Sequence, residues 1–394
     1  RELEEFDESE VMDFYTGGAT ICVANLLGSR RIVQVTPWNV VLLRGAKKEL
    51  ELPLVAGSQV VAAWVLDPYV ALLLQDGALL LIAADEQTLQ LNFVPSAHIQ
   101  GVTAGCMFRS CGAGGEAFLA VATRKGALQI FSVPALELVA EMPYLALGNV
   151  TLMDALVLPK EMEIAGIEEI EPPLVMNVGI EFIPGTSDPL LGSCACLVAI
   201  TAHGDLLVYK SFRHVVPVIG DESAKRLEFT SLRFRKEPHD FMLRGKMVWD
   251  DMFVDELERG DPTREASLQE LRTSRLMPLG GVGGLHGILV AARSPCVVIF
   301  SRGAVRVTAW KLDRNEGVRS STRYCSTQCP DGIVCIADRG KDRARGMLKI
   351  CEVPAGLRVD SPWPARSHFV GYSVHHIAFH APTGCHVAIV SKQT

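Results

Sequence analysis

The chain has 394 residues, of which 48% are hydrophobic and 21% are charged, and its formal net charge at pH 7 is -7. This negative balance argues against a surface built mainly to hold nucleic-acid phosphates, because such surfaces carry a basic excess. The eleven cysteines are scattered through strand-like segments, which is typical of reduced, buried thiols rather than of a disulfide framework.

One pattern recurs along the whole chain. An apolar run is followed by a short polar turn and then by a second run of alternating polarity. Glycine or asparagine at the tip supplies the positive φ that a tight hairpin needs. The seven hairpin tips lie at Asn39, Gly77, Gly126, Gly204, Gly303, Gly346 and Gly384. A four-stranded blade takes about 40–50 residues, so one hairpin per blade predicts an all-β fold, a single seven-bladed β-propeller over residues 1–394.

The most apolar stretch, residues 60–84, has the length of a membrane span. Polar turns at Asp67–Pro68 and at Gln75–Gly77 interrupt it, and a helix in lipid would have to bury both of them. The stretch therefore predicts consecutive strands, and we expect no membrane segment.

Two long loop insertions separate the hairpins. The first, residues 158–191, is acidic between Glu161 and Glu171 and continues with two prolines. The second, residues 214–286, is expected to be partly mobile. In it, Asp261 and Pro262 predict the start of a short helix, and the glycines of residues 280–284 predict a flexible linker.

Motifs that carry catalysis or bind nucleotides are absent from the sequence. Gly281-x-Gly283 lacks the third glycine of a dinucleotide loop, and the residues after it read as a strand rather than a helix. Neither a nucleophile elbow nor a His-Glu-x-x-His motif occurs. We therefore predict no enzyme activity, no cofactor and no small-molecule substrate. Separate blades can still assemble a site at a propeller's channel mouth, so a propeller enzyme stays open as an alternative.

Metal sites need several cysteines or histidines at close spacing. The sequence contains three candidate groups: Cys194, Cys196 and His203; Cys325, Cys329 and Cys335; His375, His376 and His380. Neither cysteine group has a matching second pair nearby, and on an alternating strand His375 points away from His376 and His380. Buried free thiols and imidazoles at a strand end are the favoured interpretation, and we predict no metal.

One basic strip is the candidate contact site that the sequence offers. Its positive charges and its aromatic residue predict binding to RNA or to an acidic partner. The alternative is an outer strand whose charges protect a sheet edge from pairing with another sheet. The strip consists of Arg233, Phe234, Arg235, Lys236, Arg244 and Lys246.

Several short motifs carry a family resemblance. Residues 32–37 (Ile-Val-Gln-Val-Thr-Pro), followed by Val41–Gly45, resemble the opening of the second propeller in the triple-propeller proteins. Those proteins include the largest subunit of the cleavage and polyadenylation specificity factor, the large subunit of the damaged-DNA-binding complex and the propeller subunit of splicing factor 3b. The polyadenylation factor is favoured by further motifs at residues 67–70, 232–239, 329–332, 361–366 and 376–380.

The resemblance implies a fragment of a longer protein that acts as a non-catalytic nuclear scaffold for pre-mRNA cleavage and polyadenylation. In that family the partners are a WD-repeat subunit, a zinc-finger subunit and a nuclease module, so this propeller would touch RNA at most indirectly. Members of that family carry a lysine-rich segment at the position of the second insertion. In this chain the insertion has a mixed, partly acidic composition, and so it departs from the family pattern. The sister roles, a ubiquitin-ligase adaptor in the damaged-DNA-binding complex or a splicing factor 3b subunit, stay open.

Overall fold

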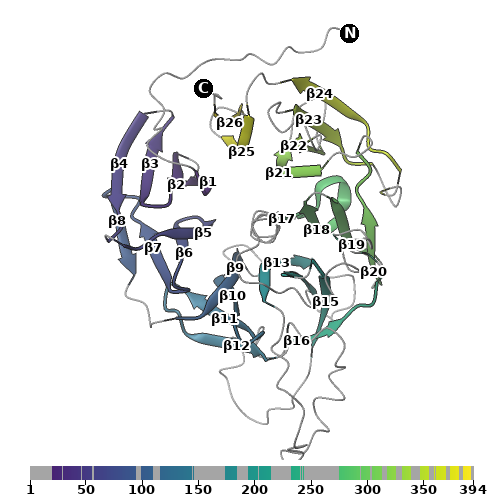
Figure 1. Ribbon diagram of the computed structural model, residues 1–394, viewed down its shortest axis with the longest axis horizontal. Coiled ribbons are helices and arrows are strands. Elements are labelled where there is room, and N and C mark those ends of the chain that lie inside the picture. Colours follow the sequence, from purple (N-terminus) through teal and green to yellow (C-terminus); the bar gives the residue numbers. More distant parts are fainter. Residues whose placement is uncertain are drawn as a thin grey trace, which may run out of the picture. The chain divides into compact units, whose positions relative to one another are not determined.

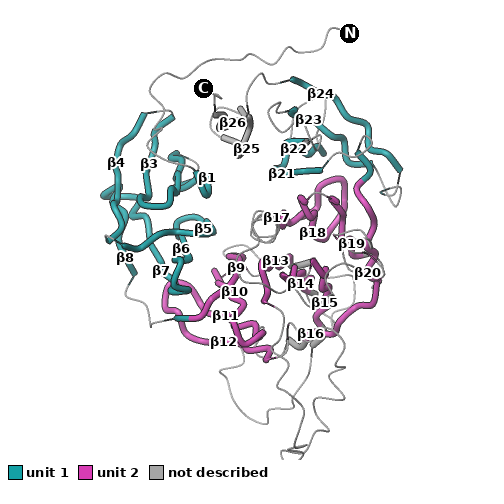
Figure 2. Tube along the Cα trace, in the orientation of Figure 1, with its two compact units in different colours: residues 1–100, 311–394 teal, residues 101–310 magenta. Residues whose placement is uncertain are grey.

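The computed structural model describes the chain in segments. These are residues 20–28, 30–45, 47–55, 57–94, 99–109, 116–143, 145, 174–183, 194–202, 204–213, 232–239, 241, 243, 275–292, 294–301, 304–312, 317–324, 331–338, 347–354, 359, 361–369, 373–380 and 385–391. The chain divides into two compact units, the first formed by residues 1–100 and 311–394 and the second by residues 101–310 (Figure 2).

The first unit contains three four-stranded antiparallel sheets and one two-stranded sheet among its described residues (Figure 1). The first sheet runs in the order β1 (Cys22–Leu26), β2 (Arg31–Val35), β3 (Asn39–Arg44) and β4 (Lys47–Pro53). The second comprises β5 (Val60–Leu66), β6 (Tyr69–Leu74), β7 (Leu79–Ala84) and β8 (Leu91–Val94). The third comprises β21 (Gly317–Tyr324), β22 (Gly332–Asp338), β23 (Met347–Glu352) and β24 (Ala365–Phe369). The two-stranded sheet pairs β25 (Ser373–His380) with β26 (Cys385–Ser391).

The part of the second unit that the structure describes contains three more four-stranded antiparallel sheets (Figure 1). One comprises β9 (Val102–Arg109), β10 (Ala117–Thr123), β11 (Leu128–Val133) and β12 (Leu138–Met142). The next comprises β13 (Val175–Ile183), β14 (Cys194–Thr201), β15 (Leu206–Arg213) and β16 (Leu232–Lys236). The last comprises β17 (Arg275–Pro278), β18 (His286–Ala291), β19 (Cys296–Ser301) and β20 (Ala304–Ala309).

Hydrophobic burial explains why these segments form strands. The second strand of several four-stranded sheets, such as β6 or β10, is an almost unbroken apolar run whose side chains are buried on both faces. Continuous apolar runs are typical of strands covered on both sides. The outermost strand β4 is instead rich in Lys and Glu and largely exposed, as an edge strand that must avoid pairing with another chain requires. These four-stranded sheets therefore pack through their middle strands.

The all-β prediction and the position of several hairpins are confirmed. Gly77, Gly126 and Gly204 lie between the second and third strands of their sheets, with φ of 85°, 74° and 84°. A residue with a Cβ rarely adopts these angles.

The predicted count of seven blades is wrong, because the described chain forms six four-stranded blades. The prediction counted one blade per hairpin. The last hairpin, β25–β26, is only a two-stranded sheet, and the described chain after β24 supplies no further strands to complete it. Within the first unit, β25 contacts β1 and β21, and Ile377 packs against Val334 and Leu348. A hairpin in sequence therefore does not show whether two partner strands complete its sheet.

The ranges predicted as insertions contain regular structure. The strand β13 lies inside residues 158–191, and β16 and β17 lie inside residues 214–286. The acidic segment between Glu161 and Glu171 and the predicted helix at Asp261–Pro262 lie outside the described residues. The predicted glycine linker is a tight turn between β17 and β18, with a short 3₁₀ segment at Val282–Gly284. No helix within the described part of the chain has the length and apolar character needed to cross a membrane.

Candidate functional site

The basic strip lies partly on β16, which is the outer strand of its sheet. Phe234 is buried in the core of the second unit together with Tyr209, so its ring does not interleave with the exposed charges. Arg235 is exposed, and its Nη2 lies 3.0 Å from Oε1 of Glu237. Of Arg233 the structure describes only the backbone, which pairs with Phe212.

The remaining members of the strip differ in their surroundings. Lys236 pairs in register with Tyr209 and is half-buried. Burial lowers the pKa of its ammonium group, and the nearby carboxylate of Asp205 partly opposes that shift. Arg244 and Lys246 lie outside the described residues. The structure thus places an arginine already paired with a carboxylate and a half-buried lysine on one edge strand. The role of the strip as a contact site stays a prediction.

The cysteine and histidine groups are only partly described. Cys196 and Cys335 are fully buried, whereas His203, Cys325 and Cys329 lie outside the described residues. The backbones of His376 and His380 pair with Ile389 and Cys385. Within the described part of the chain, no three metal-binding side chains come together.

The buried thiols have little nucleophilic character. Burial raises the pKa of the Cys106 thiol to about 12. Burial also raises the pKa of the Cys296 thiol. Because the thiolate is the reactive form of cysteine, both side chains act as small apolar groups, Cys296 within the core and the partly buried Cys106 packed against it.

Glu181 on β13 is a buried carboxylate that sequence analysis missed. Its Oε2 accepts the backbone N–H groups of Leu279 at 2.8 Å and Gly287 at 3.1 Å. Its Oε1 accepts the N–H of Gly280 at 2.7 Å and lies 3.2 Å from Nδ1 of His286. The signal for it was present: a single glutamate stands in the otherwise uncharged strand β13, and glutamate is rarely buried unless it is paired.

The carboxylate of Glu181 serves structure rather than chemistry. Each of its oxygens has two partners, three of the four contacts being backbone N–H groups of the segment around β17 and β18. Burial raises the pKa of Glu181 above its ordinary value, and the hydrogen bonds only partly oppose this shift. A general base needs a lone pair directed at a substrate proton. With both oxygens occupied, Glu181 instead ties one sheet of the second unit to the next.

An exposed aromatic lies on the first unit. The side chain of Trp38, in the turn between β2 and β3, is 51% exposed, and Val55 in the β4–β5 connection is 78% exposed. The turn is firmly held, because Oγ1 of Thr36 accepts the N–H of Trp38 at 3.4 Å and of Asn39 at 3.0 Å. The carbonyl of Trp38 also accepts the N–H of Leu54 at 2.9 Å.

Backbone hydrogen bonds join this turn to the neighbouring sheet. The N–H of Val60 donates to the carbonyl of Pro37 at 2.9 Å, and the N–H of Gln75 donates to the carbonyl of Gln59 at 2.8 Å. Three connections are thereby held side by side at one end of two adjacent sheets: β2–β3, β4–β5 and β6–β7.

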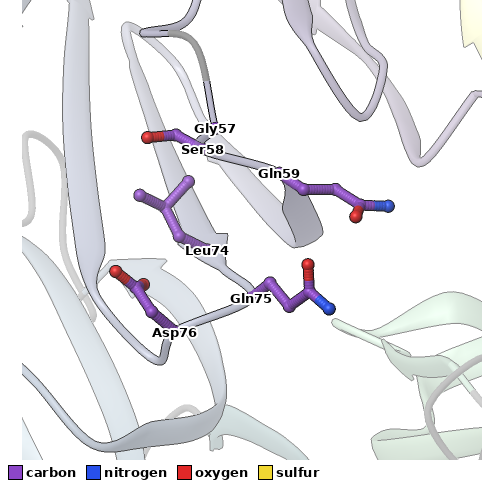
Figure 3. Close-up of a pocket in the computed structure, with 6 residues that line it drawn as sticks. All are labelled: Gly57, Ser58, Gln59, Leu74, Gln75 and Asp76. Atoms are coloured by element: carbon purple, nitrogen blue, oxygen red, sulfur yellow. The ribbon is translucent and has the colours of Figure 1, made fainter.

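A shallow pocket of about 230 Å³ lies at this junction. Its walls are formed by Gly57, Ser58, Gln59, Leu74, Gln75 and Asp76. In Figure 3 the side chains of Gln59 and Gln75 lie next to each other on one side, and Ser58, Leu74 and Asp76 lie on the other. Sites for small molecules usually enclose ~300–1,000 Å³. The pocket is therefore suited to one side chain of a larger ligand rather than to a substrate.

Comparison with known proteins identifies the family. The family model described as "RSE1/DDB1/CPSF1 second beta-propeller" matches residues 1–352. A similar protein is "Cleavage and polyadenylation specificity factor subunit 1" of Arabidopsis thaliana, 22% identical over 434 residues, which cover 97% of this chain and 29% of the relative. The protein of the same name from Drosophila melanogaster is 24% identical over 451 residues, 92% of this chain and 30% of the relative.

A third relative, from Oryza sativa subsp. japonica, is named as a probable form of the same subunit and is 22% identical over 97% of this chain. The chain spans about 30% of the length of these curated relatives. The family match confirms the resemblance found in the motifs at residues 32–45 and beyond. The chain belongs to the RSE1/DDB1/CPSF1 second β-propeller family.

Proposed function

We propose that this chain is a non-catalytic scaffold propeller of the nuclear machinery that cleaves and polyadenylates pre-mRNA. The proposal rests mainly on the relatives. They cover 92–97% of the chain, and all three are named as subunit 1 of the cleavage and polyadenylation specificity factor, one of them as a probable form. The other names in the family description belong to sister scaffolds, so the family alone does not separate these roles.

Three features of the described residues support a binding role rather than catalysis. The pocket at the β4–β5 connection is smaller than a typical substrate site. The buried carboxylate of Glu181 has both oxygens occupied. The exposed Trp38 is held by hydrogen bonds in a firm turn, and exposed tryptophans are frequent anchors of protein interfaces.

The proposed partners are a WD-repeat subunit, a zinc-finger subunit and a nuclease module of the same complex, with RNA touched at most indirectly. In this arrangement the propeller holds protein subunits in place while other subunits read the RNA and cut it.

The test is purification of the chain, tagged at its own locus, from nuclear extract. We expect the WD-repeat, zinc-finger and nuclease subunits to co-purify, and we expect depletion of the chain to reduce cleavage at polyadenylation sites in 3′-end sequencing. A tagged propeller of an unrelated family serves as control. Recovery of a cullin or of splicing factor 3b subunits, with 3′-ends unchanged, would assign the chain to a sister role and overturn the proposal.

The enzyme alternative has a separate test. Purified chain is assayed for hydrolase and lyase activity with and without a chelator. An activity that the chelator abolishes, or that is lost on changing His or Asp side chains, would contradict the scaffold role.

A further inference from the structure

We propose that the three joined connections of the first unit bind an extended, positively charged segment of a partner protein. We call this area the Trp38 surface, and it consists of Trp38, Val55, Gly57, Ser58, Gln59, Gln75 and Asp76. The inference names the kind of partner that the scaffold takes, and in that sense it rests on the proposed function.

The apolar part of the Trp38 surface supplies an anchor. Trp38 and Val55 are 51% and 78% exposed, and tryptophan is among the residues that contribute most to binding energy at interfaces. The hydrogen bonds from the N–H groups of Trp38 and Asn39 to Thr36 fix the turn before any ligand arrives. A preorganised anchor loses less conformational entropy on binding.

The charge of the Trp38 surface selects a cationic ligand. Asp76 is its one ionisable side chain. One oxygen of this exposed carboxylate accepts the N–H of Ala78 at 2.9 Å, and no cation of the described chain pairs with it. The face of an indole ring also attracts Lys and Arg side chains. The net charge of -7 adds long-range attraction for a basic segment and repels the phosphates of RNA.

The pocket explains why the ligand is an extended segment. Gln59 and Gln75 place two side-chain amides next to each other (Figure 3), and an amide both donates and accepts hydrogen bonds. These groups match the alternating N–H and C=O groups of an extended backbone. The volume of about 230 Å³ admits a single side chain, whose cationic end is drawn to Asp76.

The test is a titration of the purified 394-residue chain with labelled peptides, followed by fluorescence anisotropy. The probe is a ten-residue peptide of alternating arginine and valine. The comparison ligands are the matching peptide of alternating glutamate and valine and a single-stranded RNA ten nucleotides long. We expect the basic peptide to bind, more weakly as salt is raised, and the other two to bind at least tenfold more weakly.

Substitutions locate the binding. We expect Trp38→Ala to weaken the basic peptide about tenfold and Asp76→Asn to weaken it about threefold. Phe93→Ala removes an aromatic of comparable exposure, 46%, on β8 of the same unit. Glu137→Gln removes an exposed carboxylate of the second unit. Both controls are expected to leave the affinity unchanged.

Several results would overturn the inference. They are equal binding of the basic and acidic peptides, RNA binding that Trp38→Ala abolishes, and equal losses in the Trp38 and Phe93 variants. Asp76→Asn keeps the inference testable if Trp38→Ala perturbs folding. Failure of peptide binding in a chain that still co-purifies with the polyadenylation subunits would sink this inference and leave the proposed function standing.

Discussion

Oε1 of Glu181 on β13 lies 3.2 Å from Nδ1 of His286 on β18, although the two residues are 105 positions apart in the chain. Three backbone N–H groups of the same region complete the contacts of this carboxylate. Two neighbouring four-stranded sheets of the second unit are thus joined by hydrogen bonds that backbone N–H groups around β18 donate to a side chain of β13.

Replacing Glu181 should destabilise the second unit strongly. Glu181→Ala leaves three backbone N–H groups without their acceptor, and each buried unsatisfied donor costs about 1–3 kcal/mol. We expect the free energy of unfolding to fall by about 3–5 kcal/mol, as for other broken buried charge contacts. Urea denaturation followed by circular dichroism measures this. The exposed control Glu137→Gln should stay within about 0.5 kcal/mol of the parent, and an equally small change in Glu181→Ala would contradict the structural role.

Stability should also depend on pH through Glu181. Because burial raises the pKa of Glu181 above its ordinary value of 4.5, the folded chain holds this proton more tightly than the unfolded chain. The proton-linked part of the stabilisation by Glu181 is therefore fully present below pH 4.5 and is lost as the pH rises through the raised pKa, whereas the hydrogen bonds to its oxygens remain.

The measurement compares the parent with Glu181→Gln, which does not titrate. We expect the free energy of unfolding of the parent, minus that of Glu181→Gln, to decrease as the pH rises through the raised pKa of Glu181. A difference that increases with pH would show that the four contacts outweigh burial and lower the pKa.

The contact between β13 and β17 should tolerate no added methyl group. A Cβ at Gly179 would lie 2.9 Å from Cβ of Leu276, and overpacking of this kind costs about 1–3 kcal/mol. At Gly287, which has φ of 143°, a Cβ would lie 1.9 Å from the backbone oxygen of Val298. We therefore expect Gly287→Ala to lower the melting temperature more than Gly179→Ala does, and the reverse order in differential scanning calorimetry would contradict the packing described here.

The basic strip should protect the outer edge of its sheet from pairing with a sheet of another molecule. Arg235 and Lys236 lie on the outer strand β16, and charges on outer strands oppose pairing between sheets of different molecules. We expect Arg235→Ala combined with Lys236→Ala to increase concentration-dependent self-association in sedimentation velocity, with RNA retention unchanged. A uniform loss of RNA retention with a weaker salt dependence would instead identify the strip as a phosphate contact. Glu237→Gln, which removes the carboxylate paired with Arg235, would then strengthen RNA binding.

The strands could be predicted where local pattern determines structure. The apolar runs around Gly77, Gly126 and Gly204 are hairpins in the structure because alternation, burial and a residue that accepts positive φ all act within about ten residues. The strand β13 was missed, because the acidic and proline-rich sequence before it resembles an insertion. Its nine residues become a strand by pairing with β14, a strand that begins at Cys194.

The sequence by itself determined the all-β class, the hairpin positions and the family, since each depends on residues close together or on motifs in fixed order. Only the tertiary structure decided that, among the described residues, β25 and β26 form a two-stranded sheet, that Phe234 is buried and that Arg235 faces Glu237. It also placed Trp38, Gln59 and Gln75 on joined connections, and brought Glu181 to the backbone near residue 280. These features depend on which distant segments share a sheet edge or an interface, and that choice follows from the packing of the whole unit rather than from local periodicity.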